Sequence, residues 1–266
     1  MTQDSSSRLI AAVAALIVVA VAWDAFGTHR GPPAVRAPAV AAPAPAADST
    51  RVALRPATAS QGTSTDSSDG PSYLEQLARS ETRRRVRASA GATYLNEIVA
   101  ESQDSALHRW NNRAINPVRV CIPSGTVANF RPEFLDAIRT AFKEWERAGV
   151  PVSFDVNADS SRAEVTVRWK IQFDIDRTGQ TDLEWDQDGH ILKAAVTIAT
   201  FDPKGRPLDT DDVRAIALHE IGHVLGLDHS PDSSDLMYAR GTVRQITDRD
   251  IRTATLLYQL APGSLR

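Results

Sequence analysis

The 266-residue sequence contains one cysteine, Cys121, so no disulfide can form within the chain. It also lacks an excess of charge of either sign, because 30 basic residues against 33 acidic residues give a formal net charge of −3. This charge balance gives no indication of binding to nucleic acid. A single cysteine fits a reducing compartment, and it also fits an exported protein that does without disulfides. The N-terminal sequence favours export.

A run of apolar residues near the N-terminus is short for a membrane span. Residues 9–22 (LIAAVAALIVVAVA) follow a polar segment, residues 1–8. A transmembrane helix needs roughly 20 apolar residues, so the run fits a signal peptide with Ala20-Val21-Ala22 as its cleavage site. If it is not cleaved, residues 9–26 form a marginal membrane anchor. Both alternatives place the rest of the chain outside the cytoplasm, either membrane-anchored or secreted.

Composition divides the rest of the chain into three regions. Residues 27–71 are rich in Ala, Pro and Ser and bury too little apolar surface to fold, so we expect a disordered linker. Residues 72–115 are expected to form a basic, helical segment ahead of a compact domain at 116–260. A solvated helix face is the favoured interpretation of the basic run, and a processing site or contact with an anionic surface is the alternative. The basic run comprises Arg79, Arg83, Arg84, Arg85 and Arg87.

Periodicity within residues 116–260 predicts an α/β (α+β) domain. Apolar residues at helical spacing predict a long helix from Arg131 to Gly149, a second helix over 210–225 and a last helix from Thr247, where Asp250 completes a capping box. Strands are predicted at residues 118–122, 152–154, 163–169, 183–185 and 190–200, the last two as a hairpin about Asp186-Gln187-Asp188-Gly189.

The chemistry is concentrated in residues 219–229, which read HEIGHVLGLDH. His219 and His223 are four residues apart on a helix, so their imidazoles lie on one face and can share an ion. Gly226 is expected to turn the chain through a positive φ and bring His229 back to the same ion. Three neutral imidazoles leave one tetrahedral position open, which is typical of a catalytic zinc site. Glu220 flanks the ion and is the candidate general base.

This motif, followed by a methionine, resembles the metzincin zinc metalloproteases. Met237 lies eight residues after His229, and with Ser230 and the sequence Leu236-Met237-Tyr238 it is similar to the matrixins. These form the matrix-metalloproteinase family, peptidase family M10, and the chain resembles its minimal bacterial type. The resemblance implies a metzincin-like zincin domain with a twisted mixed sheet, a long first helix, an active-site helix and a C-terminal helix. It also implies that Met237 forms a floor beneath the zinc.

The activity implied is that of a zinc metalloendopeptidase acting on protein or peptide substrates. Glu220 would serve as base, and His219, His223 and His229 would hold Zn²⁺. Two alternatives stay open: a catalytically silent zinc-binding module, and a zinc hydrolase acting on cell-wall peptides. The resemblance further implies that the strand at 191–200 is the edge strand that borders the cleft and pairs with an extended substrate.

The chain departs from the matrixin pattern at two positions after the zinc motif. Ala239 stands where matrixins usually have proline, and Asp235 where they usually have alanine, so the loop 239–245 is a poor guide to substrate preference. Many matrixins are held inactive by a cysteine in a pro-segment. Cys121 lies in VRVCIPS, a predicted strand, and is therefore not expected to act as such a switch.

An acidic run in the predicted hairpin partly imitates a calcium-binding loop. It lacks the distal bidentate glutamate of an EF-hand, so a solvated hairpin is the favoured interpretation. We interpret His190, beside this run, as a strand residue. The run comprises Asp182, Glu184, Asp186 and Asp188.

Overall fold

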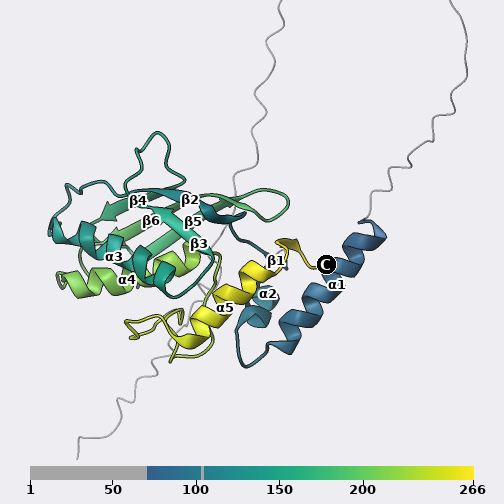
Figure 1. Ribbon diagram of the computed structural model, residues 1–266. Helices are drawn as coiled ribbons and strands as arrows, with labels where there is room; N and C mark the ends of the chain where they lie inside the picture. The colour runs from purple at the N-terminus through teal and green to yellow at the C-terminus, as the bar shows by residue number, and fades with distance from the viewer. Residues whose placement is uncertain (1–70, 103–104) are drawn as a thin grey trace, which may run out of the picture. The chain divides into compact units, whose positions relative to one another are not determined.

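The computed structural model describes residues 71–102 and 105–266 (Figure 1). The signal peptide or anchor predicted at 9–26, and all but the last residue of the linker predicted at 27–71, lie outside these residues. Across the two described ranges, no helix is both long enough and apolar enough to cross a membrane. The elements, in chain order, are α1 (Tyr73–Ala88), α2 (Leu95–Glu101), β1 (Ala106–Leu107), β2 (Arg113–Cys121), α3 (Glu133–Arg147), β3 (Val152–Asp155), β4 (Val165–Lys170), β5 (Gly179–Trp185), β6 (Ile191–Ala199), α4 (Thr210–Val224), α5 (Asp248–Gln259) and β7 (Gly263–Ser264).

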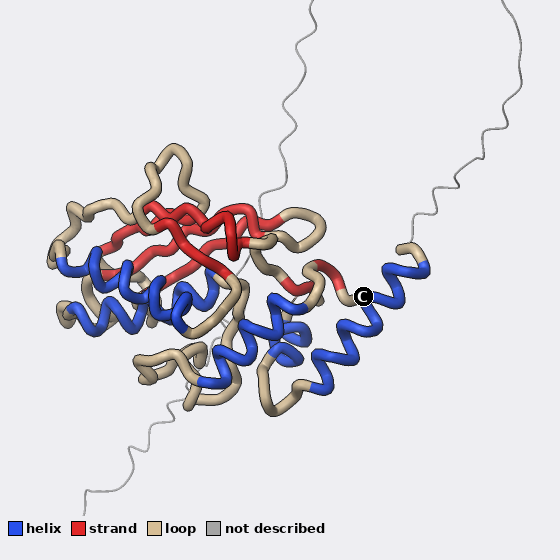
Figure 2. The backbone as a smooth tube through the Cα atoms, viewed as in Figure 1, coloured by secondary structure: helices blue, strands red, loops and turns tan. Residues whose placement is uncertain are grey.

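The central element is a mixed sheet with the strand order β3-β2-β4-β6-β5. Strands β3, β2, β4 and β6 run parallel to one another, and β5 runs antiparallel to β6. Helices α3 and α4 pack against each other on one face of the sheet (Figures 1 and 2). The predicted α/β fold, with a long first helix, an active-site helix and a C-terminal helix, is confirmed.

Helix α3 joins the sheet to α4 through its apolar stripe. Phe134, Ile138 and Trp145 recur at helical spacing and are buried, and burying each such side chain stabilises the fold by about 1.5–3 kcal/mol. The Trp145 indole donates a hydrogen bond to the Leu218 carbonyl of α4 at 2.9 Å. The chain leaves α3 through Gly149 at a φ of 87°, as the sequence predicts. Thus α3 fixes the position of α4 as well as completing the core.

The prediction of the edge strand is wrong. The strand at 191–200 corresponds to β6, which is paired on both sides, with β4 and with β5. The edge strand on this side of the sheet is β5, and β3 forms the other edge. Strand β5 begins at Gly179, four residues before the predicted start at Leu183. Both arms of the hairpin alternate in hydrophobicity, and that alternation does not show which arm continues into the parallel sheet.

A register shift at the hairpin end changes which residues of β6 face the core. Simple alternation along the sequence predicts that Leu192, Ala194, Val196 and Ile198 share one apolar face. The shift between Glu184 and Trp185 turns Ile191 inward instead, and Leu192 is half exposed. An extra residue on one strand reverses the alternation locally, which periodicity alone does not reveal.

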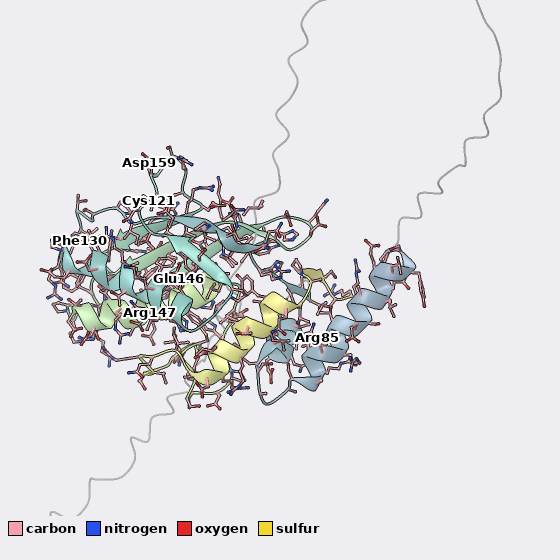
Figure 3. The ribbon with its side chains drawn as sticks, viewed as in Figure 1. Arg85, Cys121, Phe130, Glu146, Arg147 and Asp159 are labelled. Atoms are coloured by element: carbon pink, nitrogen blue, oxygen red, sulfur yellow. The ribbon has the colours of Figure 1, made fainter. Side chains whose placement is uncertain are left out.

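Cys121 is the last residue of β2 and lies in the sheet (Figure 3). It pairs with Thr166 of β4. Its assignment to a strand is confirmed. That it plays no part in latency stays a prediction.

The basic run of α1 contacts the C-terminal segment. Arg79 donates to the Arg266 carbonyl at 2.8 Å, and Arg83 donates to the Leu265 carbonyl. Arg85, labelled in Figure 3, donates to the side-chain oxygen of Gln259 at 3.1 Å. In addition, β1 pairs with β7 near the C-terminus. Three of the five arginines therefore join the two ends of the described chain, an arrangement that none of our sequence-based interpretations included.

The segment between α1 and α2 is also part of the core. Tyr94 is fully buried, and its hydroxyl donates to Oδ1 of Asp250 at 2.9 Å. Burial raises the pKa of Tyr94, so the phenol stays protonated and remains a donor. Asp250 in turn accepts the backbone N–H groups of Leu236 and Met237 at 3.1 and 3.4 Å. Residues ahead of position 109 thus support the turn that carries Met237. The domain boundary at 116 stays a prediction.

Tyr94→Phe is expected to lower the free energy of unfolding by about 1–2 kcal/mol, because the buried Asp250 carboxylate loses one of its donors. Urea denaturation of the purified protein measures this difference. Tyr73→Phe, at an exposed position on α1, is the control and should change stability little. Equal stability of Tyr94→Phe and the unaltered protein would contradict the supporting role.

Candidate metal centre and active site

Helix α4 carries the first half of the candidate site. Its N-terminus is closed by a capping box in which Asp209 accepts the N–H of Asp212 at 2.8 Å and Asp212 accepts the N–H of Asp209 at 3.2 Å. The helix then runs without interruption to Val224. His219 and His223 lie one turn apart near its end, with ring centroids 5.0 Å from each other. Local helix geometry is therefore sufficient to bring these two imidazoles together.

The turn after α4 brings in the third histidine. Gly226 has a φ of 95°, which confirms the positive φ predicted from the sequence. A Cβ at this position would lie 2.0 Å from the carbonyl oxygen of His108, so the backbone leaves no room for any side chain. Beyond the turn the ring of His229 lies 5.4 Å from that of His219 and 4.9 Å from that of His223, measured between centroids.

The three imidazoles fit a single zinc ion. One ligand atom from each lies within 4.8 Å of the others. Nδ1 of His219 lies 2.8 Å from the Leu236 carbonyl, and Nδ1 of His223 lies 2.8 Å from the Leu227 carbonyl. A carbonyl can only accept, so each Nδ1 carries the hydrogen and each Nε2 lone pair is left for a metal. Burial, followed by the nearby imidazoles, lowers the pKa of His223 to about 4, which keeps it in the neutral, ligating form near pH 7.

Glu220 lies beside this cluster with its carboxylate against β5. Its side chain is buried. Its Oε2 accepts a hydrogen bond from the Thr181 hydroxyl at 2.7 Å. Gly179, at the start of β5, lies so close that a Cβ there would be 2.3 Å from Oε1 of Glu220. The candidate base is thus held by the edge strand as well as by its own helix.

A methionine turn lies directly under α4. Met237 is fully buried, and a Cβ on Gly222 would lie 2.3 Å from its sulfur, so the two residues are in close contact. The turn is closed by the Ser230 N–H, which donates to the Met237 carbonyl at 2.9 Å. Because the Leu236 carbonyl also accepts from His219, the turn orients one imidazole of the cluster.

Comparison with known proteins agrees with this geometry. Residues 109–259 match the family model described as Matrixin. The chain belongs to the matrixin family. It is 31% identical over 109 residues to a protein named Metalloendoproteinase 1-MMP from Arabidopsis thaliana, an alignment that covers 38% of this chain and 30% of the relative. The chain thus matches less than a third of that relative's length. Matrixins are metalloproteases that use zinc, and the three histidines provide a suitable ligand set.

One departure from the matrixin pattern has a structural explanation. Asp235, where matrixins usually have alanine, is buried and lies 2.9 Å from the guanidinium of Arg249 on α5. It also accepts from the hydroxyls of Ser230 at 2.5 Å and Thr247 at 3.2 Å. A buried carboxylate is tolerated when it is paired and hydrogen-bonded in this way. In this matrixin the ion pair ties the methionine turn to the start of α5.

The acidic hairpin contains a second group of possible ligands. Asp186, Asp188 and His190 offer atoms within 4.8 Å of one another. Oδ1 of Asp186 accepts the N–H groups of Asp188 and His190 at 3.0 and 2.8 Å, so this carboxylate closes the turn as the hairpin interpretation expects. His190 forms an isolated bridge with Arg109, one residue before β6 begins. We assign no ion to this group.

Several residues at the site carry no signal in the sequence motif. Thr181 and Gly179 hold Glu220 from β5, and Asp250 and Tyr94 support the methionine turn. The sequence predicts only a helix-capping role for Asp250, a local role that it also performs. Nothing in the spacing of the residues around Thr181 predicts contact with a residue 39 positions later.

Proposed function

We propose that this matrixin is a zinc-dependent endopeptidase in which His219, His223 and His229 hold the metal and Glu220 acts as general base. The observation that carries the proposal is the convergence of three imidazoles with a buried carboxylate from the same helix. The histidines contribute neutral nitrogen donors, two of them oriented by backbone carbonyls. A binding module has no use for a base held in this position, which argues against the catalytically silent alternative.

When bound, zinc would act as a Lewis acid that polarises a carbonyl and acidifies water. The remaining steps belong to the chain. Glu220 takes the proton from the water that attacks the scissile carbonyl carbon. It then donates that proton to the amine nitrogen as the C–N bond breaks, so that the carboxylate is regenerated. Burial of Glu220 against β5 keeps its carboxylate from turning into solvent.

We further propose that the substrate extends the sheet along β5. Antiparallel pairing alternates which backbone groups face the neighbouring strand. The Ala199 N–H donates to the Thr178 carbonyl at 2.9 Å, so the backbone N–H and C=O of Thr178 face β6. By alternation, the backbone N–H and C=O groups of Gly179, Thr181 and Leu183 face the open edge. An extended peptide can pair with these groups and lie across the zinc site.

The choice between protein and cell-wall peptides as substrate requires an assay. Cleavage-site profiling on a proteome-derived peptide library measures activity on proteins. Digestion of purified cell-wall fragments under the same conditions measures activity on cell-wall peptides. The match to the matrixin family favours proteins or peptides.

Glu220→Gln is expected to retain one zinc per chain and to lose turnover by about 10²–10⁴-fold, because the amide keeps the shape of the side chain but cannot take a proton. Metal analysis and peptide cleavage of the purified protein test this. Glu133→Gln, at an exposed position on α3, is the matched control. Near-normal turnover of zinc-loaded Glu220→Gln would exclude the mechanism.

Leu183→Pro should reduce kcat/KM for peptides at least about tenfold below Leu183→Ala, because proline removes an N–H at the open edge and leaves the ladder to β6 intact. The alanine variant controls for loss of the leucine side chain. Circular dichroism and zinc content identify the folded variants. Equal kcat/KM of Leu183→Pro and Leu183→Ala would show that β5 is not part of the substrate-binding site.

We propose that the catalytic domain works outside the cytoplasm, with residues 27–71 as a spacer. The support is the apolar run at 9–22 followed at once by a segment too poor in apolar residues to fold. Cell fractionation with N-terminal sequencing is expected to find either a chain that begins at Trp23 and is released or an uncleaved chain in the membrane fraction. An uncleaved chain recovered in the cytoplasmic fraction would refute both forms.

A further inference from the structure

Two residues of the edge strand enclose the Glu220 carboxylate. Thr181 and Gly179 both belong to β5 and, being two residues apart, point to the same face of the sheet, toward α4. The first donates its hydroxyl to Oε2 of Glu220, and the second lies against Oε1. The two oxygens of one carboxylate therefore meet two different constraints from one strand.

The contact from Thr181 fixes the rotation of the Glu220 side chain. Its hydroxyl oxygen lies 2.7 Å from Oε2 and 3.1 Å from the backbone carbonyl of the same glutamate. Both partners are buried. A hydroxyl bonded to a carboxylate is a charge-assisted donor and is stronger than a neutral one. Within the described residues, no other hydrogen bond to this carboxylate is found, so the hydroxyl is its one hydrogen-bonding partner there.

The contact from Gly179 limits the position of the same group. A Cβ at residue 179 would lie 2.3 Å from Oε1 and 2.8 Å from both Cδ and Cγ of Glu220. Such distances do not occur between nonbonded atoms, so any other residue here would push the carboxylate away from β5. Gly179 shows no positive φ, and the need for glycine is therefore one of space, not of backbone conformation.

We propose that Thr181 and Gly179 are positioning residues for the catalytic base. Together they hold the Glu220 carboxylate in the orientation from which it takes and returns a proton. Neither residue exchanges a proton or bonds to the metal. The proposal rests on the role of Glu220 proposed above, and it adds that β5 serves two purposes, pairing with the substrate and orienting the base.

Thr181→Val tests the hydroxyl, because valine keeps the branched shape and removes the donor. A misplacement on the order of 1 Å costs roughly a hundredfold, so we expect kcat to fall about 10–100-fold with KM changed less than about twofold. Zinc content should stay at one per chain. Thr181→Ser retains the donor and should recover kcat to within about threefold of the unaltered protein.

Thr197→Val is the matched control, since Thr197 lies on the neighbouring strand β6 and pairs with Gln180, whose side chain points to the opposite face. A purely structural role for Thr181 predicts a lower melting temperature with normal kcat per zinc-loaded molecule. That result would overturn the proposal, and so would Thr181→Ser behaving like Thr181→Val.

Gly179→Ala gives a readout that does not depend on activity. A crystal structure of this variant, with or without metal, should show the Glu220 carboxylate displaced from β5 while the three imidazoles keep their places. An unmoved carboxylate would overturn the role of Gly179. If the variant does not fold, the valine and serine substitutions at Thr181 still decide the proposal.

A double-mutant comparison separates this proposal from the identity of the base. If Glu220 is the base and Thr181 positions it, Thr181→Val has no further effect on the residual rate of Glu220→Gln. High activity of Glu220→Gln alone would refute the proposed function itself. Inactive Glu220→Gln together with near-normal Thr181→Val would leave that function standing and refute only the positioning role.

Discussion

The reversal of the chain after α4 is the constraint on which the candidate metal centre depends. Helix geometry alone brings two histidines together, but the third can join them only if the helix ends immediately and turns back. Gly226 makes that turn against the His108 carbonyl.

The last carbonyls of the helix need partners once the helix stops. Trp110 donates to the Val224 carbonyl at 2.8 Å and Tyr258 donates to the Leu225 carbonyl at 2.9 Å. Two aromatic side chains from distant parts of the chain thus complete the helix end.

The methionine turn forms a second layer under the same helix, and polar contacts hold it in place. Asp250 binds its backbone N–H groups, and the pair of Asp235 with Arg249 joins it to α5. A buried carboxylate is costly unless its lone pairs are satisfied. Here Tyr94, from the segment ahead of the matrixin match, supplies one of the donors to Asp250. This segment and the catalytic domain therefore share one core.

In the proposed mechanism, strand β5 connects substrate binding with proton transfer. As the edge strand it offers backbone groups on one side, and through Thr181 it contacts the base on its α4-facing surface. A peptide paired with β5 would be placed relative to the same backbone that orients Glu220. Registration of the scissile bond against the base would then depend on a single strand, which pairs with β6 along its length.

The sequence by itself determined the features that depend on neighbours a few residues apart. The spacing of His219 and His223, the turn at Gly226 and the capping box at Thr247 follow from helix periodicity and local backbone geometry, and the structure contains all three. The order of β5 and β6, the partner of Glu220 and the burial of Asp250 were decided only by the tertiary structure. The contacts that establish them join residues 39 positions apart for Thr181 and Glu220, and 156 for Tyr94 and Asp250. Local periodicity shows that a strand has one apolar face and a helix has a polar cap, but it does not show which distant element will lie against them.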